Sequence, residues 1–336
     1  MRSYLVYLVA RAAMLFFRWL PRVVAHPLLD MLASAAYYID ARHRRIADVN
    51  LRIAFPELDA RGRRRIAQLS FRNTARNLLE IARMPRLTRD SIASLVEYDP
   101  DQGLANCLAA RAMGKGILYL TGHFSAWELL PAAHAVYGYP LSFVTRPLDN
   151  PALERYLTRM REMHGNRVIP KKNAARQILE VLRAGGDVGV LVDQNTTLQE
   201  GMFADLFGLP AATTTSFARL ALHTGATVLP GYIAPMRDGR YRVKFRPPVD
   251  LIRTGDLTRD IEENTRMLNL IVESIIREQP ESWLWGHKRW KNRPPGQPDL
   301  YALTDGELQA FLARERKPAA EGVAGNQDSG RQKPNI

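Results

Sequence analysis

The segment 116–128, GILYLTGHFSAWE, combines a short apolar run, a glycine and a His/Glu pair. The apolar run at 117–120 is of the kind that is buried on both faces of a parallel sheet. Gly122 permits a sharp turn, and a helix-compatible stretch with Ser125 as its N-cap follows. The segment therefore predicts a strand, a turn and a helix, with His123 at the carboxyl end of the strand. Open α/β sheets usually bind their ligands at that edge.

His123 and Glu128 are five residues apart, whereas two residues on one helix face are three or four apart. If His123 stays in the turn and Glu128 lies one turn into the helix, the carboxylate can fold back and accept a hydrogen bond from one imidazole nitrogen. The other nitrogen is then available as a base. The alternative is a turn histidine beside an unrelated, solvent-facing glutamate, and spacing alone does not decide between them.

Strand and helix signals alternate beyond this segment. Short apolar runs bounded by turn residues predict strands at 141–145, 168–169, 188–192, 227–234 and 241–245. Amphipathic periodicity predicts helices at 151–164, 173–183 and 257–277, and 203–212 is expected to be a loop. Asp193 and Gln194 directly follow 188–192, so they share an edge with His123 if the strands run parallel. The expected fold class is α/β, with a mixed, largely parallel central sheet flanked by helices.

Residues 4–20, YLVYLVARAAMLFFRWL, are nearly all apolar and contain two charged residues, Arg11 and Arg18. Their seven-residue separation places both arginines on one helix face. Two interpretations stay open: a tilted spanning helix whose arginines reach the interface, or a helix lying in the interface with its arginines among the headgroups. Both are membrane anchors, and a soluble core helix is the alternative. The basic run at 42–45 follows, which favours a cytoplasmic location for the rest of the chain.

Composition divides the chain into four parts. Residues 1–20 are the expected anchor helix, and 21–91 form a helical region because apolar residues recur there at helical spacing. The α/β core is expected at 92–316. The remainder, 317–336, is rich in Gly, Asn, Gln, Lys and Pro and is expected to be disordered.

The charge balance indicates an acidic partner. The 336 residues include 47 Lys and Arg against 34 Asp and Glu, which gives a net charge of +13. Nucleic acid, anionic lipid and an acidic carrier protein all fit such a surface. No recognition-helix or RNA-binding motif is present, which disfavours nucleic acid. The single cysteine, Cys107, excludes an internal disulfide and a cysteine-based zinc site.

The segment 283–290, WLWGHKRW, interleaves three tryptophans with His287, Lys288 and Arg289. Tryptophan prefers the membrane interface and cations pair with phosphate, so the segment can dock anionic headgroups. It can equally be a packed carboxyl-terminal segment with a solvated basic face.

Several stretches occur in a characteristic order. They are RIADVNLRIAFPE at 45–57, HFSAWE at 123–128, RPLDNP at 146–151, DQ at 193–194, FGLP at 207–210 and WLWGHKRWK at 283–291. Because of these stretches, the region from about residue 30 to 300 resembles the late acyltransferases of lipid A biosynthesis, the lauroyl/myristoyl transferase family. That family lies within the lysophospholipid-type acyltransferases, which share a His-x4-acid motif. The chain departs from the pattern at 125–126, where Ser-Ala replaces the frequent Gly-Asn.

The resemblance implies a reaction and a site. His123 would deprotonate the 3-hydroxyl of an acyl chain already on a glucosamine disaccharide, held in place by Glu128, and the alkoxide would attack an acyl thioester. Substrate binding would fall to Arg146 and to Arg161, the latter at a phosphate or an oxyanion, unless Arg161 is merely solvated. The active-site edge would be shaped by the hydrogen bonds of Asp193 and Gln194. No metal or organic cofactor is needed, because the thioester supplies the driving force.

The implied partners are an acyl carrier protein or coenzyme A thioester as donor and a phosphorylated glycolipid as acceptor. The implied location is the cytoplasmic face of the cell inner membrane. Two rival functions stay open: an acyltransferase that uses acyl-coenzyme A on another glycolipid, glycerolipid or aminolipid, and a peripheral membrane adaptor without chemistry.

Overall fold

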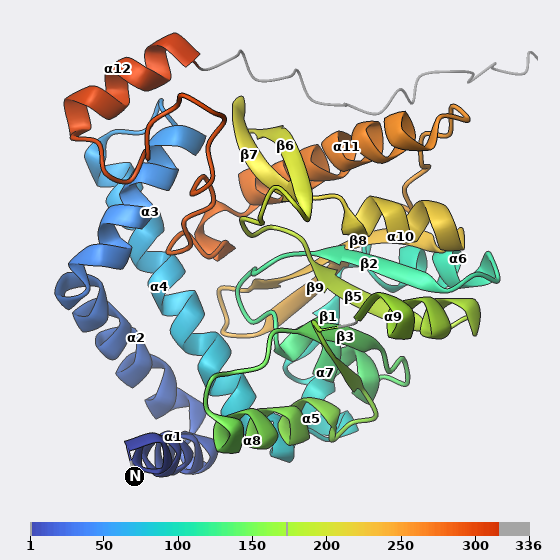
Figure 1. The fold of residues 1–336 in the computed structure, drawn as a ribbon. Helices are drawn as coiled ribbons and strands as arrows, with labels where there is room; N and C mark the ends of the chain where they lie inside the picture. The colour runs from blue at the N-terminus through green and yellow to red at the C-terminus, as the bar shows by residue number, and fades with distance from the viewer. Residues whose placement is uncertain (1, 173, 316–336) are drawn as a thin grey trace, which may run out of the picture.

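The centre of the molecule is a seven-stranded sheet, seen in a computed structural model that describes residues 2–172 and 174–315 (Figure 1). The strand order is β1-β9-β8-β2-β5-β3-β4. Strands β8, β2, β5, β3 and β4 run parallel, whereas β9 is antiparallel to β8 and parallel to β1. The sheet is therefore mixed and largely parallel, as predicted. The strands are β1 Val96–Tyr98, β2 Ile117–Thr121, β3 Ser142–Thr145, β4 Arg167–Pro170, β5 Asp187–Leu191, β8 Thr227–Pro235 and β9 Tyr241–Phe245.

Helices cover the sheet and extend beyond it. The amino-terminal helices are α1 Arg2–Trp19, α2 Arg22–Ile39, α3 Ala41–Ala54 and α4 Ala60–Arg83. The helices that accompany the sheet are α5 Arg89–Ala93, α6 Leu104–Ala112, α7 Leu129–Val136, α8 Pro151–Glu162, α9 Ala174–Arg183, α10 Ser216–Thr224 and α11 Leu257–Glu278, and α12 is Asp305–Glu315. Two short 3-10 helices, η1 Met84–Arg86 and η2 Pro280–Ser282, follow α4 and α11. The expected tail at 317–336 lies outside the described residues, as does Asn173.

Strand β2 shows why the sheet is buried on both faces. Successive side chains of a strand point to opposite faces. Leu118 and Leu120 belong to a core cluster that includes residues of α9, α10 and α11. Ile117 and Tyr119 belong to a second cluster, which includes residues of α6, α7 and α8. An apolar run without alternation is what burial on two faces requires.

The expectation of a loop at 203–212 is wrong. These residues form most of a hairpin, β6 Gly201–Leu206 paired antiparallel with β7 Leu209–Thr214. The two turn residues, Phe207 and Gly208, have φ values of 53° and 73°. Two central residues with positive φ give a turn whose twist suits a two-residue hairpin. Phenylalanine rarely adopts this conformation, so the residue types at the turn did not predict a hairpin.

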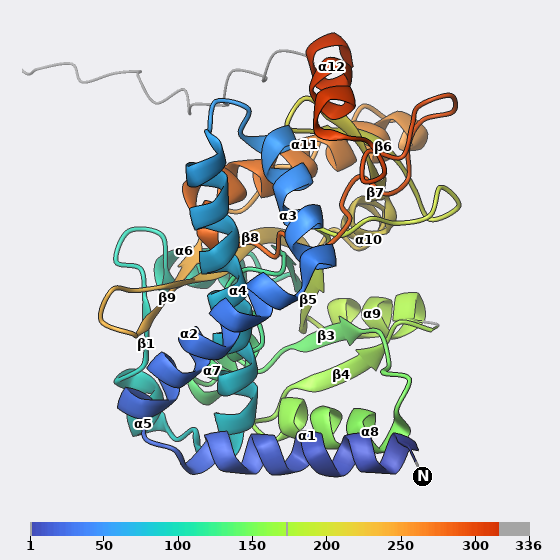
Figure 2. The same ribbon diagram turned by 90° about the vertical axis from the view of Figure 1, so that its left-hand side faces the viewer.

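Helix α1 lies along one edge of the molecule, beside α8 and against α4 (Figure 2). Arg18 was expected at the membrane interface but points into the protein, where its Nε donates to the Ala82 carbonyl at 3.1 Å and Nη2 donates to Tyr156 Oη at 3.1 Å. Large apolar side chains of α1 face solvent instead, among them Leu5 and Phe16. Within the described part of the chain, no helix combines the length and apolarity needed to cross a membrane.

The tryptophan-rich segment is packed, so docking of headgroups by its tryptophans is wrong. Trp283, Trp285 and Trp290 are all buried. The basic side chain Arg289 is buried as well rather than solvated, and it donates to the Ala212 carbonyl and to Thr213 Oγ1 at 2.6 and 2.7 Å.

Polar side chains of the amino-terminal helices hold this segment in place. Asn50 of α3 donates to the carbonyl oxygens of Trp285 and His287 at 2.8 and 2.7 Å. Ser70 of α4 donates to the Trp283 carbonyl at 2.5 Å. The helical region thereby fixes the carboxyl-terminal segment against the sheet.

Candidate active site

The residues that follow β2 and β5 meet at one edge of the sheet. The two strands are parallel neighbours, and Thr121 pairs in register with Leu191. His123 and Asp193 each come two residues after the end of their strand. Because parallel strands end on the same side, the two side chains are brought together although 70 residues separate them. The predicted shared edge is therefore confirmed for this pair.

Asp193 holds the His123 imidazole. Nδ1 of His123 lies 2.9 Å from Asp193 Oδ1, and the backbone N–H of His123 donates to Oδ2 at 2.9 Å. Trp283 Nε1 also donates to Oδ2, at 2.8 Å. An ionised carboxylate only accepts hydrogen bonds, so Nδ1 carries the proton, and in the neutral imidazole Nε2 then presents its lone pair.

Burial and charge act in opposite directions on Asp193. Burial alone raises the pKa of this carboxyl, but the charge of His123 and the hydrogen bonds from His123 and Trp283 outweigh burial and lower the pKa to about 2. Asp193 is therefore ionised at neutral pH. The His123 side chain, by contrast, is 20% exposed. The pair consists of a buried anion and an imidazole that remains accessible to solvent.

Gly122 is needed for space rather than for an unusual φ. A Cβ atom at this position would lie 2.8 Å from the Asp193 carboxyl carbon and 2.8 Å from the Phe124 ring. No side chain fits at those distances without displacing one of them. The glycine that the sequence assigned to a sharp turn therefore lets the carboxylate approach the His123 backbone.

The turn after β2 differs from the expected helix start. Ser125 has a φ of 47°, and helix α7 begins four residues later, at Leu129. The backbone N–H of Ser125 donates to the Ser282 carbonyl at 2.7 Å, and Phe124 forms an antiparallel bridge with Trp283. This pairing ties residues 124–125 to the segment 282–283, and the positive φ of Ser125 departs from the extended conformation that an N-cap residue adopts.

Glu128 faces Arg161 and not the His123 ring. Arg161 Nε and Nη2 donate to the two Glu128 oxygens at 3.0 and 2.6 Å, and both side chains are largely buried. Burial lowers the pKa of Arg161, but the hydrogen bond and charge of Glu128 outweigh it and raise the pKa. The hydrogen bond that the imidazole was expected to donate to Glu128 is instead donated to Asp193. The α7 start places Glu128 at the helix N-cap, where α8 is its neighbour, rather than one turn inside.

Gln194 and Arg146 occupy the same edge. The Gln194 amide nitrogen lies 3.3 Å from His123 Nε2 and 3.4 Å from Nδ1, so Gln194 borders the free lone pair. Arg146 directly follows β3, which is parallel to β5, and its side chain is exposed. Sequence order predicted this edge for Gln194, whereas the position of Arg146 there comes from the structure.

Two contributors were missed by sequence reasoning. Trp283 bonds Asp193 directly, and the only sequence signal was its place in the tryptophan-rich segment. Asn77 of α4 accepts a hydrogen bond from the Glu128 backbone N–H at 3.0 Å, so α4 fixes the start of α7. Asn77 is buried although asparagine is usually exposed, and no motif in the sequence marked it.

Among residues 2–172 and 174–315, no three His, Cys, Asp or Glu side chains gather as a metal site requires. The arrangement that is present, a buried carboxylate, an oriented imidazole and a neighbouring amide, suits the removal of a proton from a hydroxyl.

Known proteins resemble this chain along most of its length. The chain is 28% identical over 284 residues to the lipid A biosynthesis lauroyltransferase of Escherichia coli strain K12, covering 84% of this chain and 90% of that protein. It is 29% identical over 292 residues to the palmitoleoyltransferase of the same organism, covering 84% and 91%. The corresponding myristoyltransferase is 25% identical over 297 residues, covering 88% and 89%.

The family comparison agrees with these relatives. The sequence profile of the bacterial lipid A biosynthesis acyltransferases matches residues 1–292. The stretches that carried the resemblance therefore belong to a match that includes the helical region, the sheet and the edge with His123. The chain belongs to the bacterial lipid A biosynthesis acyltransferase family and is an acyltransferase.

Proposed function

We propose that this protein transfers a fatty acyl group from an acyl thioester to a hydroxyl of a lipid A precursor, with His123 as general base. The observation that carries the proposal is the hydrogen bond from His123 Nδ1 to Asp193 on an imidazole that remains 20% exposed. A base needs a fixed tautomer and access to the substrate, and this geometry supplies both.

The reaction follows from the free lone pair. Nε2 of His123 takes the proton of the acceptor hydroxyl as its oxygen attacks the thioester carbonyl carbon. The tetrahedral intermediate collapses by breaking the C–S bond, which leaves an ester on the acceptor. The imidazolium returns its proton to the departing thiolate, so the enzyme ends in its starting state. Asp193 stabilises the imidazolium between these two proton transfers.

Asp193 takes the positioning role first expected of Glu128. Glu128 and Arg161 then act as one unit that ties the turn after His123 to α8. The pair uses Nε and Nη2 of Arg161, and Nη1 makes no hydrogen bond within the described residues. We assign Nη1 to the oxyanion or to an acceptor phosphate, because a guanidinium binds either through directed N–H groups. Gln194 would yield its place beside Nε2 to the acceptor hydroxyl, and Arg146 would bind acceptor phosphate at the rim.

An acyl carrier protein is the donor that the charge favours. The net charge of +13 attracts acidic proteins and phosphorylated lipids alike. An acyl-coenzyme A donor with another lipid acceptor remains the alternative enzyme. The family assignment argues against the adaptor without chemistry.

The amino-terminal helices support attachment to the cytoplasmic face of the inner membrane. Exposed apolar side chains follow α1 and the start of α2, with Leu5 at 62%, Val9 at 61%, Phe16 at 55% and Val23 at 83% exposure. Moving one such side chain from water into an apolar phase is worth about 1.5 to 3 kcal/mol. Several of them together favour an interfacial helix, because the inward Arg18 is already bound by protein.

The function is tested by incubating the purified protein with acyl carrier protein and coenzyme A thioesters and with lipid A precursors that carry a free hydroxyl on an acyl chain. We expect a product heavier by one acyl group from the carrier protein donor. Transfer only to glycerolipids would contradict the proposed lipid A acceptor, and transfer only from coenzyme A would contradict the proposed carrier-protein donor. Product from neither donor by folded protein would contradict the proposed reaction.

Membrane attachment is tested separately by replacing Leu5, Val9 and Phe16 together with glutamine. These side chains are exposed, so the fold should survive, and we expect the protein to leave the membrane fraction after centrifugation. Unchanged sedimentation of the folded variant would show that another surface holds the protein.

A further inference from the structure

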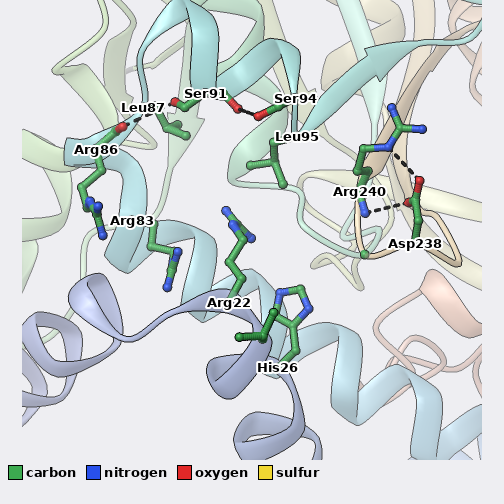
Figure 3. Close-up of a pocket in the computed structure, with 12 residues that line it drawn as sticks. Arg22, His26, Arg83, Arg86, Leu87, Ser91, Ser94, Leu95, Asp238 and Arg240 are labelled. Carbon is green, nitrogen blue, oxygen red and sulfur yellow. Dashed lines mark hydrogen bonds and ion pairs between the residues drawn. The ribbon is translucent and has the colours of Figure 1, made fainter.

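A cavity of about 420 Å³ lies where the junction of α1 and α2 meets the end of α4, helix α5 and the turn between β8 and β9. Figure 3 shows Arg83 and Arg86 on one side, Asp238 and Arg240 on the other, and Arg22 between them. His123 and the residues around it do not line this cavity. The cavity is therefore separate from the candidate active site.

The lining carries an excess of positive charge. Arg22 is neutralised by Glu80, which receives two hydrogen bonds at 2.7 Å, and Arg240 pairs with Asp238 and Glu97. Arg83 and Arg86 have no such partner. Among the residues that the structure describes, neither forms an ion pair, and each donates to a backbone carbonyl, of Leu20 and of Arg18 respectively. Two guanidinium charges in the lining thus lack a counter-charge.

Arg83 is the more deeply buried of the two arginines. The residue is buried at 8% exposure, and its Nε has no hydrogen-bond partner in the part of the chain that the structure describes. Burial lowers the pKa of this guanidinium, and the nearby charges of Arg22 and Arg86 lower it further despite Glu80. A buried cation without a counter-charge is unfavourable by several kcal/mol. His26 also lines the cavity, and its Nε2 is buried without a hydrogen-bond partner among the described residues.

The chemistry of the lining selects a phosphate group. Guanidinium groups bind tetrahedral oxyanions through paired, directed N–H donors. The rim adds a second feature, because Val23 lines the cavity and is 83% exposed, and Trp19, whose ring lies 4.7 Å below the Arg86 guanidinium, is 68% exposed. An apolar rim around a cationic interior matches a molecule with a phosphate head and an apolar body.

We propose that this cavity binds the phosphate headgroup of an anionic membrane lipid, with Arg83 and Arg86 as its ligands. The site would fix the orientation of the protein on the bilayer, since it opens beside the exposed apolar residues of α1 and α2. The lipid held here is distinct from the molecule acylated at His123. The inference goes beyond the proposed acyl transfer and does not depend on it.

The test compares binding to phosphatidylglycerol-containing vesicles, to phosphatidylcholine vesicles and to soluble glycerol 3-phosphate. The variants are Arg86→Gln and Arg83→Gln/Arg86→Gln. Arg237→Gln is the matched control, because Arg237 is exposed in the same β8–β9 turn but does not line the cavity. We expect the double variant to bind anionic vesicles and glycerol 3-phosphate about tenfold or more weakly, since charge-assisted hydrogen bonds are lost. Arg237→Gln should change binding less than roughly twofold, because Arg237 is exposed and its charge is screened by salt.

Three results would overturn the proposal: equal losses in Arg237→Gln and the double variant, equal binding of neutral and anionic vesicles by the wild type, and a loss confined to glycerol 3-phosphate. Circular dichroism checks folding. Arg86 is exposed, so Arg86→Gln alone keeps the test valid if the buried Arg83 cannot be replaced. His123→Ala should bind vesicles like the wild type, which separates failure of this site from failure of the proposed reaction.

Discussion

Two histidines, His123 and His134, lie eleven residues apart and have contrasting environments. His134, on α7, is 1% exposed, with Nδ1 2.7 Å from Tyr98 Oη and Nε2 3.1 Å from Tyr119 Oη. Burial lowers its pKa to about 3, with a further contribution from the charge of Arg111. His123 has a carboxylate on one nitrogen and a solvent-accessible second nitrogen.

The difference shows what makes a histidine available as a base. Both rings are oriented by hydrogen bonds, but His134 has both nitrogens engaged by phenols, and Asp187 in the same cluster pairs with Arg111. Without a carboxylate of its own, a buried imidazolium is unfavourable, so His134 stays neutral and structural. Asp193 gives His123 the stabilisation that His134 lacks.

The largest effect is expected from His123→Ala, which removes the base itself. Acyl transfer should fall by about 10² to 10⁴-fold, the usual contribution of a positioned general base. Product formation is measured by mass spectrometry, with circular dichroism as the folding check. His134→Gln is the paired variant and should retain acyl transfer. Full acyl transfer by His123→Ala would contradict the role of His123 as the base. Loss of acyl transfer in folded His134→Gln would contradict the structural role of His134.

Asp193→Asn tests the carboxylate that separates the two sites. We expect kcat to fall by about 10²-fold or more while KM changes little, because tautomer and imidazolium stabilisation are lost without a change in shape. A purely structural role for Asp193 would instead lower the free energy of unfolding, measured with urea, and would raise KM along with the loss of kcat.

Glu128→Gln asks whether the motif glutamate acts on His123 or on Arg161. The variant breaks a largely buried ion pair, so urea unfolding should show a loss of about 2 to 3 kcal/mol in the free energy of unfolding. Its loss of kcat should be smaller than that of Asp193→Asn. A larger loss of kcat than in Asp193→Asn would return the positioning role to Glu128.

His134→Gln is expected to have the smallest effect on acyl transfer, and its effect is seen instead in stability as a function of pH. With a native pKa of about 3 and an ordinary value of 6.5, the unfolded state binds the proton first as the pH falls. The contribution of neutral His134 is therefore complete above about pH 6.5 and is lost on acidification toward pH 3, by at most about 1.4 kcal/mol per pH unit. Urea unfolding of the variant should show a flatter pH dependence in that window. An unchanged slope would mean that His134 does not titrate as a buried neutral group.

Local signals were sufficient for most of the sheet. Strands β2, β3, β4, β5, β8 and β9 and helices α8 and α11 were all predicted, because apolar period and flanking turn residues act over a few residues. Asn150 illustrates this for α8, where its side chain accepts hydrogen bonds from the N–H groups of Ala152 and Leu153. The shared edge of His123, Asp193 and Gln194 followed from strand order alone.

Long-range contacts were not predictable in the same way. The hairpin at β6 and β7 depends on Phe207 adopting a positive φ while its side chain is fully buried. The burial of the three tryptophans depends on α3 and α4, more than 200 residues earlier in the chain, which bind the backbone beside them. Neither arrangement leaves a periodic signal in its own segment.

The amino-acid sequence by itself determined that a histidine follows a buried strand at the ligand-binding edge of an α/β sheet, since apolar runs and turns are encoded locally. Only the tertiary structure decided which carboxylate serves it. Glu128 is five residues from His123 but is directed toward α8, whereas Asp193 is brought into contact by the parallel register of β2 and β5. Two residues that are close in sequence can still point in different directions, because the backbone between them can turn. Strand pairing, by contrast, places the residues that follow two neighbouring strands close enough to form a hydrogen bond.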